Sequence, residues 1–452
     1  MLTLDTKPDL PERLFSQIDF TNGAVAAVSG GSDSTALLLL LKDHLDRTAP
    51  AAKLLAVTVD HGLRPSSAAE ARAVAGLCAG RGITHRILAW SGPKPSTGLP
   101  AAAREARYGL LAKAARAEGI GLILTGHTAD DQAETVLMRQ ARDEGRGLAG
   151  MALATLYEWR TWIVRPLLGM RRAALRNFLQ RENVGWAEDP TNVDEHFERP
   201  RIRAMLAGEG GVPRFAEAIT LAGRAAKERE LLGHRAAALV RSFASRPATG
   251  LVRLDREFAT SGDDRAAVYA LRILLAATGG ISFLPDEACS EALFVRLKGG
   301  PLCATLSRTV IDARRAGIFL RREFRNLPPA QPAAGTALWD GRRRITLGDK
   351  SRALLIAPLG SAAAAKRAIA EDGTPPSLVR AALAAEPALW RGDECLGLPQ
   401  ETQASAALAA CPVVAPFARF LPSFDLAPAD AVARLVGALP APALPFGGHS
   451  AG

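Results

Sequence analysis

The stretch that most constrains the fold covers residues 23–41, where an apolar run, a Gly-Gly pair and a second apolar run follow one another. This pattern predicts a buried strand over 24–28, a loop over 29–32 and a helix from about Asp33. Glycines lack a Cβ and let an anion approach the loop amides, and the unpaired N–H groups at a helix start favour negative charge. The loop therefore predicts a site for a phosphate chain.

The string SGGSDS lacks the lysine of a Walker loop and places Asp33 where the anion would come. A carboxylate repels phosphates unless a divalent cation lies between them, so Asp33 predicts Mg²⁺ that is shared with a nucleotide. The alternative, a chance Gly-Gly turn, is disfavoured by the flanking strand and helix. The string resembles the pyrophosphate loop of the ATP pyrophosphatases. The residues expected to contact ATP here are Ser29, Gly30, Gly31, Ser32, Asp33 and Ser34.

Length and charge limit the remaining choices. A chain of 452 residues predicts about three domains, and its net charge of +10 predicts an acidic partner, either nucleic acid or a membrane surface, unless this is simply a basic enzyme. The 5 cysteines form no CxxC pair, which indicates a reducing compartment without a disulfide framework or zinc ribbon. The N-terminus does not resemble a signal peptide, and the apolar run at 36–41 is too short to span a bilayer. We therefore expect a cytoplasmic protein without a membrane partner.

The following segments repeat the strand and helix pattern. A second buried strand over 54–59 ends in Asp60, His61 and Gly62, at the edge where parallel sheets bind ligands, and Gly62 would let the backbone approach an adenine ring. Further strands are expected over 83–90, 121–125 and 162–168, with helices between them. This order predicts an α/β protein, with a Rossmann-like parallel sheet that carries helices on both faces.

An acidic cluster follows the strand at 121–125. Asp130 and Glu134 are four residues apart on the next helix, as are His127 and Asp131. Like charges at this spacing repel, so the cluster needs a cation or a raised pKa. A metal-bridged nucleotide would supply the cation, and general-base work on an amine would use the raised pKa. The alternative is an acidic first turn that complements its own helix dipole.

Arginines accompany these segments. Arg104 and Arg107 lie near Tyr108 on one helix face, which favours contact with phosphate or tRNA over a solvated face. Arg139 and Arg142 belong to a basic, glycine-containing segment over 138–151. The remaining candidates for phosphate contact are Arg199, Arg201 and Arg203.

These motifs occur in a recognisable order and together resemble the tRNA(Ile)-lysidine synthetases, densely over about 20–206. They are SGGSDS, VDHGLR (59–64), AAR with RY (102–108), GHTADDQAET (126–135), RPLL (165–168) and WAEDPTN (186–192), the last of which predicts a turn. The sequence departs from that family at Pro200, where asparagine is usual, and in a shorter loop over 138–151.

The resemblance implies a fold of the adenine nucleotide alpha hydrolase type that binds ATP and Mg²⁺. It implies that C2 of the wobble cytidine in the CAU anticodon of tRNA(Ile) is activated as an O-adenylate. The ε-amine of free L-lysine then displaces AMP and forms lysidine. Asp33 fits metal binding, and Asp130, Asp131 and Glu134 fit metal or proton duties whose division among the three stays open. The catalytic candidates are these four acids and His127.

The rest of the chain predicts a division into residues 1–211, a helical or mixed domain over 212–325 and an α+β domain over 326–452. Helices are expected over 212–243, 264–278 and 285–298, and hairpins within 305–324 and 337–347. This half would serve either oligomerisation, as in a homodimer, or tRNA binding. The surplus of arginine favours tRNA binding.

Three rival functions remain open. A tRNA thiolase would need catalytic cysteines, and Cys78 is the one cysteine within the nucleotide domain. An amidating ATP pyrophosphatase, such as NAD or GMP synthetase, would lack the WAEDPTN segment and the basic second half. A non-catalytic RNA-binding protein would not need Asp33, Asp130, Asp131 and Glu134 intact.

Overall fold

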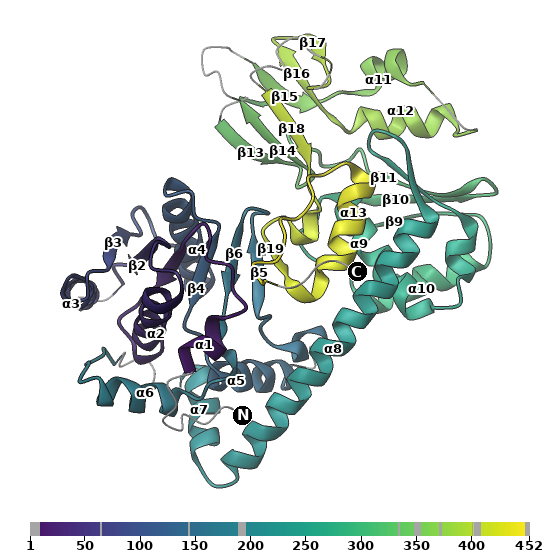
Figure 1. The fold of residues 1–452 in the computed structure, drawn as a ribbon. Helices are drawn as coiled ribbons and strands as arrows, with labels where there is room; N and C mark the ends of the chain where they lie inside the picture. The colour runs from purple at the N-terminus through teal and green to yellow at the C-terminus, as the bar shows by residue number, and fades with distance from the viewer. Residues whose placement is uncertain are drawn as a thin grey trace. The chain divides into compact units, whose positions relative to one another are not determined.

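The computed structural model describes residues 10–63, 66–142, 145–188, 196–332, 335–347, 354–369, 373–399, 401 and 408–447. The chain forms two compact units, one of Met1–Arg229 with Pro442–Gly452 and one of Glu230–Ala441 (Figure 1). The division into 1–211, 212–325 and 326–452 stays a prediction. Its first boundary lies at the start of the long helix α8 (Gly211–Phe243).

The first unit is built on a sheet with the strand order β5–β6–β4–β1–β2–β3. All neighbours pair in parallel except β5, which runs antiparallel to β6. Their bounds are Ala24–Ala27 for β1, Leu54–Asp60 for β2, Thr84–Ala89 for β3, Leu122–Thr125 for β4, Ala154–Tyr157 for β5 and Thr161–Val164 for β6.

Helices connect the parallel strands. They are α2 (Ser32–Thr48), α3 (Ser67–Gly80), α4 (Leu99–Ala117) and α5 (Ala129–Gln140). The chain moves outward from β1 to β3 and then returns past β1 to β4. Because such crossovers are right-handed, α2 and α3 cover one face and α4 covers the other (Figure 1). The α/β fold with helices on both faces is confirmed, and the order reverses between β1 and β4, where such sheets bind ligands.

The long leucine run of α2 is buried in the core of the first unit. Leu37, Leu38 and Leu41 of α2 have no exposed surface, and neither do Ala24 and Val25 of β1. Each fully buried leucine contributes about 1.5–3 kcal/mol to folding. Within the described ranges, no helix is long and apolar enough to cross a membrane.

Two details of this sheet differ from the sequence-based expectation. The strand expected over 162–168 ends at Val164, because Pro166 begins a 3₁₀ turn over Pro166–Gly169. The strand β5 was not expected at all. It pairs with β6 through a tight turn in which Glu158 and Trp159 take positive φ angles of 49° and 58°, a conformation that no glycine signals in the sequence.

The second unit contains more strand than expected. Its helices α9 (Asp264–Gly279) and α10 (Glu287–Lys298) and the hairpin of β10 (Thr309–Arg314) with β11 (Gly317–Arg322) are confirmed. That hairpin belongs to a five-stranded sheet in the order β7–β8–β11–β10–β9, which the sequence analysis did not anticipate. The added strands are Ala244–Ala248 for β7, Leu251–Leu254 for β8 and Leu302–Leu306 for β9.

The last part of this unit is α+β. The hairpin of β13 (Gly335–Trp339) and β14 (Arg343–Leu347), with its turn at Asp340 and Gly341, is confirmed. The remaining strands and α-helices are β12 (Gln331–Pro332), β15 (Leu355–Pro358), β16 (Pro387–Arg391), β17 (Glu394–Gly397), β18 (Leu408–Pro412), β19 (Phe420–Pro422), α11 (Ser361–Arg367), α12 (Pro376–Ala384) and α13 (Leu426–Val436).

Buried charges join β11 to this hairpin. Arg322 donates to both carboxylate oxygens of Asp340, with each distance 3.0 Å, and has no exposed side-chain surface. Arg342 continues the network from Asp340 at 2.8 Å to Glu386 at 2.6 Å. Buried charges persist when they are paired in this way, and breaking one pair leaves an uncompensated charge.

In the first unit, Gly126 sets how closely the segment after β4 approaches the start of α2. A Cβ on Gly126 would lie 2.8 Å from the backbone carbon and oxygen of Asp33 and from the amide nitrogen of Ser34. We expect Gly126→Ala to cost roughly 1–3 kcal/mol of stability, because backbone cannot move aside as a side chain can. Urea unfolding measures the loss. Gly121→Ala is the control, because nothing lies within 4 Å of its added Cβ, and an equal loss in both variants would contradict this explanation.

Candidate active site

A cavity of about 1040 Å³ lies at the carboxyl ends of β1, β2 and β4 in the first unit. Its position is the switch point where the strand order reverses. Gly30, Gly62, Arg139, Arg142 and Arg201 do not line it. The predicted site residues that line it are Ser29, Gly31, Ser32, Asp33, Ser34, Asp60, His61, Arg104, Arg107, His127, Asp130, Asp131, Glu134, Arg199 and Arg203.

The phosphate loop is held from within. The Ser34 hydroxyl accepts a hydrogen bond from the Ser29 amide and donates one to the Gly31 carbonyl, both at 3.1 Å. Gly30 takes a φ of +88°, where a side chain would be strained. No side chain of the described residues caps α2 at Gly31. The first turn of α2 therefore presents amide groups that suit an anion.

The segment of the WAEDPTN string lies against this loop. The Ala187 amide donates to the Gly30 carbonyl at 2.9 Å, and the Trp186 indole donates to Glu188 at 2.9 Å. The hydrogen bond between Ala187 and Gly30 holds the phosphate loop against this segment. The turn predicted over 186–192 continues into residues 189–192, which lie outside the described residues.

The first turn of α5 carries a reciprocal cap. Thr128 donates its amide to Asp131 Oδ2 at 2.9 Å, and its hydroxyl accepts from the Asp131 amide at 3.4 Å. One oxygen of Asp131 therefore caps the start of its own helix. This agrees with the alternative that the acidic first turn serves the helix itself. Its other oxygen, Oδ1, faces an arginine in the cavity.

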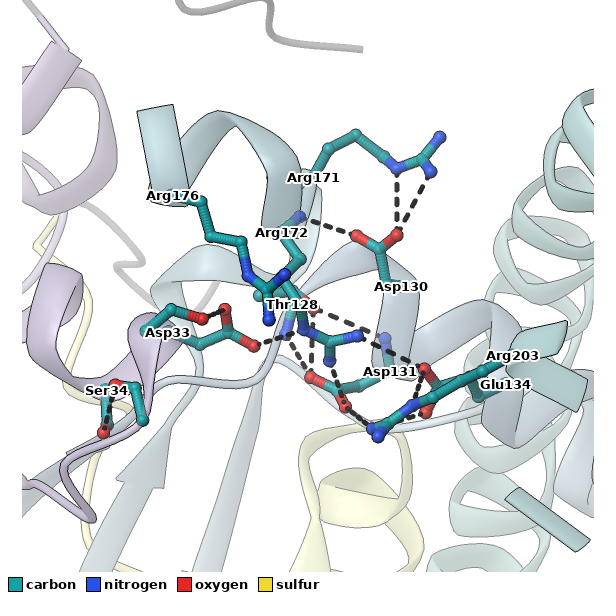
Figure 2. Close-up of polar contacts among 12 residues, drawn as sticks. Asp33, Ser34, Thr128, Asp130, Asp131, Glu134, Arg171, Arg172, Arg176 and Arg203 are labelled. Carbon is teal, nitrogen blue, oxygen red and sulfur yellow. Dashed lines mark hydrogen bonds and ion pairs between the residues drawn. The ribbon is translucent and has the colours of Figure 1, made fainter. Parts of the chain in front are cut away.

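That arginine is Arg172, at the start of α6 (Arg172–Arg181). Its Nε lies 2.8 Å from Asp33 Oδ2, its Nη2 lies 3.0 Å from Asp131 Oδ1 and its Nη1 lies 3.4 Å from Glu134 Oε1. Figure 2 shows the guanidinium between these carboxylates, which come from α2 and α5. One side chain of α6 thus joins both acidic segments.

Sequence reasoning did not single out Arg171 or Arg172. The pattern over 171–183 predicts a basic amphipathic helix and indicates no role in the site. One signal was present, because two arginines at a helix start oppose the helix dipole and therefore call for anionic partners. Arg171 meets this need with Asp130, at 3.2 Å from its Nε. The backbone amide of Arg172 also donates to Asp130, at 2.7 Å.

Glu134 is the most enclosed of the described acids that line the cavity, with 1% of its side chain exposed. Besides Arg172, it pairs with Arg203 at 2.7 Å and with Arg199 at 2.8 Å. Arg199 and Arg203 therefore contact the acidic cluster, although the sequence had suggested phosphate contact for both. The cluster is compensated by arginines from α6 and from α7 (Glu198–Ala207).

The acids differ in their ionisation. Burial raises the pKa of Asp33, and the opposing pull of Arg172 does not cancel the effect. Burial also favours a higher pKa for Asp131, but Arg172 and the Thr128 amide outweigh it and lower the pKa overall. Asp33 is therefore the acid whose charge is less well compensated, and an added cation would stabilise it.

Arg104 and Arg107 form a cationic part of the cavity lining, the cationic wall. The guanidinium carbons of Arg104 and Arg107 lie 5.0 and 5.1 Å from the ring centroid of Tyr108, which is fully buried. Burial alone would raise the pKa of Tyr108, but Arg107 and Arg104 outweigh it and lower the pKa to about 8. This wall suits an anionic ligand.

The remaining predicted residues of the cavity have local roles. Asp60 accepts a hydrogen bond of 2.8 Å from the Gly62 amide. This hydrogen bond shapes the turn after β2 and lowers the pKa of Asp60. His61 packs edge-on against Trp90, with ring centroids 5.9 Å apart. The Nδ1 atom of His127 lies 2.9 Å from the Thr125 hydroxyl.

Three predicted RNA-contacting arginines lie outside the cavity wall. Arg142 forms an ion pair with Glu198, and Arg201 donates to the His196 carbonyl at 3.1 Å. Arg139 packs beside Gly147, where an added Cβ would lie 2.9 Å from the Arg139 Cδ. Their contact with tRNA stays a prediction.

The cavity does not hold a preformed metal cage. Among the described residues, no group of three or more His, Cys, Asp or Glu side chains is arranged to bind a metal by itself. A cation at Asp33 would therefore share its coordination with oxygens that a ligand brings, as Mg²⁺ commonly does with phosphates.

The fold and site define a class of protein, the PP-loop proteins. Residues 11–209 match the family described as PP-loop domain. The tRNA(Ile)-lysidine synthase of Mesorhizobium japonicum (strain LMG 29417 / CECT 9101 / MAFF 303099) is 70% identical over 99% of this chain and 100% of its own. That of Rhizobium meliloti (strain 1021) is 38% identical over 91% of each chain, and that of Brucella ovis (strain ATCC 25840 / 63/290 / NCTC 10512) is 43% identical over 70% of this chain and 72% of its own. The chain belongs to the tRNA(Ile)-lysidine synthase family.

His127 provides a test of whether water reaches this part of the site. Burial, followed by the Arg165 guanidinium, lowers its pKa from 6.5 to about 3, so the folded protein holds the ring neutral. The unfolded chain takes up a proton below pH 6.5 and the folded chain does not, so stability falls as pH falls from 6.5 toward 3. Replacing His127 by Gln should reduce this slope by roughly 1.4 kcal/mol per pH unit between about pH 6 and 4.

Urea unfolding at several pH values measures the slope. His234→Gln is the control, because it removes an exposed histidine of α8 instead of a buried one. Equal slopes in the wild type and His127→Gln would mean that the His127 ring is hydrated and takes up its proton in the folded state.

Proposed function

We propose that this protein is an ATP-dependent ligase that forms lysidine at the wobble cytidine of the CAU anticodon of tRNA(Ile). The observation that carries the proposal is a relative of that name that is 70% identical over 99% of this chain. The cavity supports the proposal, because the phosphate loop, the acidic first turn of α5 and the cationic wall all line it. The reaction joins free L-lysine through its ε-amine to C2 of the cytidine, after that cytidine is activated as an O-adenylate.

The phosphate loop is the proposed site of the ATP phosphates, at the amides that begin α2. Asp33 would hold Mg²⁺ together with phosphate oxygens, because it lies at the loop in the cavity lining and burial leaves its charge in need of a compensating cation. When bound, Mg²⁺ neutralises charge on the phosphates and favours departure of pyrophosphate. The protein supplies the anion-binding amides and the carboxylate.

The acidic cluster at the start of α5, which consists of Asp130, Asp131 and Glu134, is the proposed site of the lysine nucleophile. Asp131 has a lowered pKa and stays charged, which suits attraction of an ammonium group. His127 is neutral, with its pKa lowered to about 3, so its ring adds no positive charge that would repel the ammonium. The proton duties are left to Asp130, Asp131 and Glu134, which lie together at the start of α5.

The cationic wall and the second unit are the proposed contacts for tRNA. Arg104 and Arg107 face the cavity, and the chain carries a net charge of +10. Each neutralised phosphate should add about 0.7 to 0.9 to the salt dependence of log affinity. A tRNA substrate favours a cytoplasmic location for the protein. Homodimerisation stays a prediction.

The structure weakens the thiolase alternative. Cys78 is buried within α3, and burial raises its pKa to about 11, which disfavours a reactive thiolate. Among the described residues, the lining of the cavity includes no cysteine.

Incorporation of radiolabelled lysine into transcripts of tRNA(Ile) tests the function directly. We expect incorporation that requires ATP and the CAU anticodon. An amidating ligase or a passive RNA-binding protein would bind one substrate without this transfer. Folded protein that binds ATP and tRNA but transfers no lysine would overturn the proposal.

Asp33→Ala should abolish adenylate formation and leave tRNA affinity within about twofold, because Asp33 is assigned to the nucleotide and the cationic wall is unchanged. Pyrophosphate release and filter binding of tRNA measure the two effects. Asp43→Ala is a matched control with both functions retained, because it removes an exposed carboxylate of the same helix that pairs with Arg47 at 2.9 Å. A parallel loss of tRNA affinity in Asp33→Ala would identify the residue as structural.

A further inference from the structure

Arg172 occupies a position that helix electrostatics disfavour. It begins α6, where a positive charge opposes the helix dipole. Its guanidinium is nevertheless largely enclosed, with 20% of the side chain exposed, and contacts Asp33, Asp131 and Glu134. Burial favours a lower pKa for Arg172, but the carboxylates of Asp131 and Asp33 outweigh it, so the group stays charged.

The three carboxylates depend on Arg172 to different degrees. Glu134 also pairs with Arg203 and Arg199, at 2.7 and 2.8 Å. Within the described residues, the ion pair of Asp33 is with Arg172, and its other polar contact is the neutral Ser32 hydroxyl. Asp33 would therefore lose its compensating charge if Arg172 moved, while Glu134 would keep two.

We propose that Arg172 is a positioning residue that acts as a resident counter-ion. It holds Asp33 and Asp131 charged and close together before a nucleotide arrives, and it gives up Asp33 to the divalent cation that the nucleotide brings. The inference rests on the proposed function, because it assigns Asp33 to a nucleotide-bound cation.

The released guanidinium would remain useful in the same cavity. Arg172 and Arg176 are one turn apart on α6, and both line the cavity with the phosphate loop. The loop itself carries no lysine. A guanidinium binds phosphate oxygens through two parallel hydrogen bonds, so Arg172 can supply the positive charge that a Walker loop takes from its lysine. Exchange of partners at Asp33 thus couples cation binding to phosphate binding.

Manganese binding to the protein without nucleotide, tRNA or lysine tests the counter-ion role. Mn²⁺ substitutes for Mg²⁺, and the free ion is measured by electron paramagnetic resonance during a titration. In Arg172→Gln, the carboxylates of Asp33 and Asp131 lose a shared cation. We expect this variant to bind Mn²⁺ at least about tenfold more tightly than the wild type. Mn²⁺ should also restore part of its lost thermal stability.

Two further variants locate the effect. Arg171→Gln removes a neighbouring charge that contacts Asp130 and not Asp33, so its Mn²⁺ affinity should match the wild type. Adding Asp33→Asn to Arg172→Gln should remove the gained affinity. If Arg172→Gln does not fold, Arg172→Lys provides the same test, because it keeps the charge and loses the forked geometry, and we expect an intermediate affinity.

Unchanged Mn²⁺ affinity in a folded Arg172→Gln, or in Arg172→Lys where the first variant does not fold, would show that Arg172 is structural and would overturn the proposal. A gain that persists after Asp33→Asn would place the cation elsewhere and also overturn it. None of these measurements uses lysine transfer. Failure of the counter-ion role is therefore distinguishable from failure of the proposed reaction.

Discussion

The active-site cavity depends on one ionic interaction, the insertion of the Arg172 guanidinium between acids of α2 and α5. Asp33 and Asp131 are partly or largely enclosed and would repel each other without it. Charges removed from water persist in proteins when a partner compensates them. Because Arg172 begins α6, the same contact ties a third helix to the two strand ends that carry the acids.

The sheet makes this contact possible. Asp33 follows β1 and Asp131 follows β4, and these strands are neighbours although almost a hundred residues separate the two acids. The reversal of strand order between β1 and β4 leaves their carboxyl ends uncovered by a connecting helix. Gly126 then allows the segment after β4 to approach the first turn of α2 closely enough for one guanidinium to contact both acids.

The sequence was sufficient for features that depend on local pattern. The phosphate loop, the acid-led helix α5 and the Asp340–Gly341 turn all combine residue types whose conformational preferences act over a few positions. The role of Arg172 was missed, because its partner Asp33 lies 139 residues away and no local preference reports that distance. The strand β5 was missed for a similar reason, since its pairing with β6 depends on positive φ angles at Glu158 and Trp159.

The ion pairs of the acidic cluster also bear on how the cavity accepts the anionic substrates of the proposed reaction. Phosphates of RNA and of ATP are both anionic, and an acidic wall that was not compensated would repel both. Arg172, Arg199 and Arg203 reduce that repulsion by pairing with the acids while the cavity lacks a cationic ligand. A cation that arrives with the nucleotide can then replace one internal pair without leaving any carboxylate unpaired. Because each acid keeps a partner throughout, the site can hold a dense cluster of carboxylates beside polyanionic substrates.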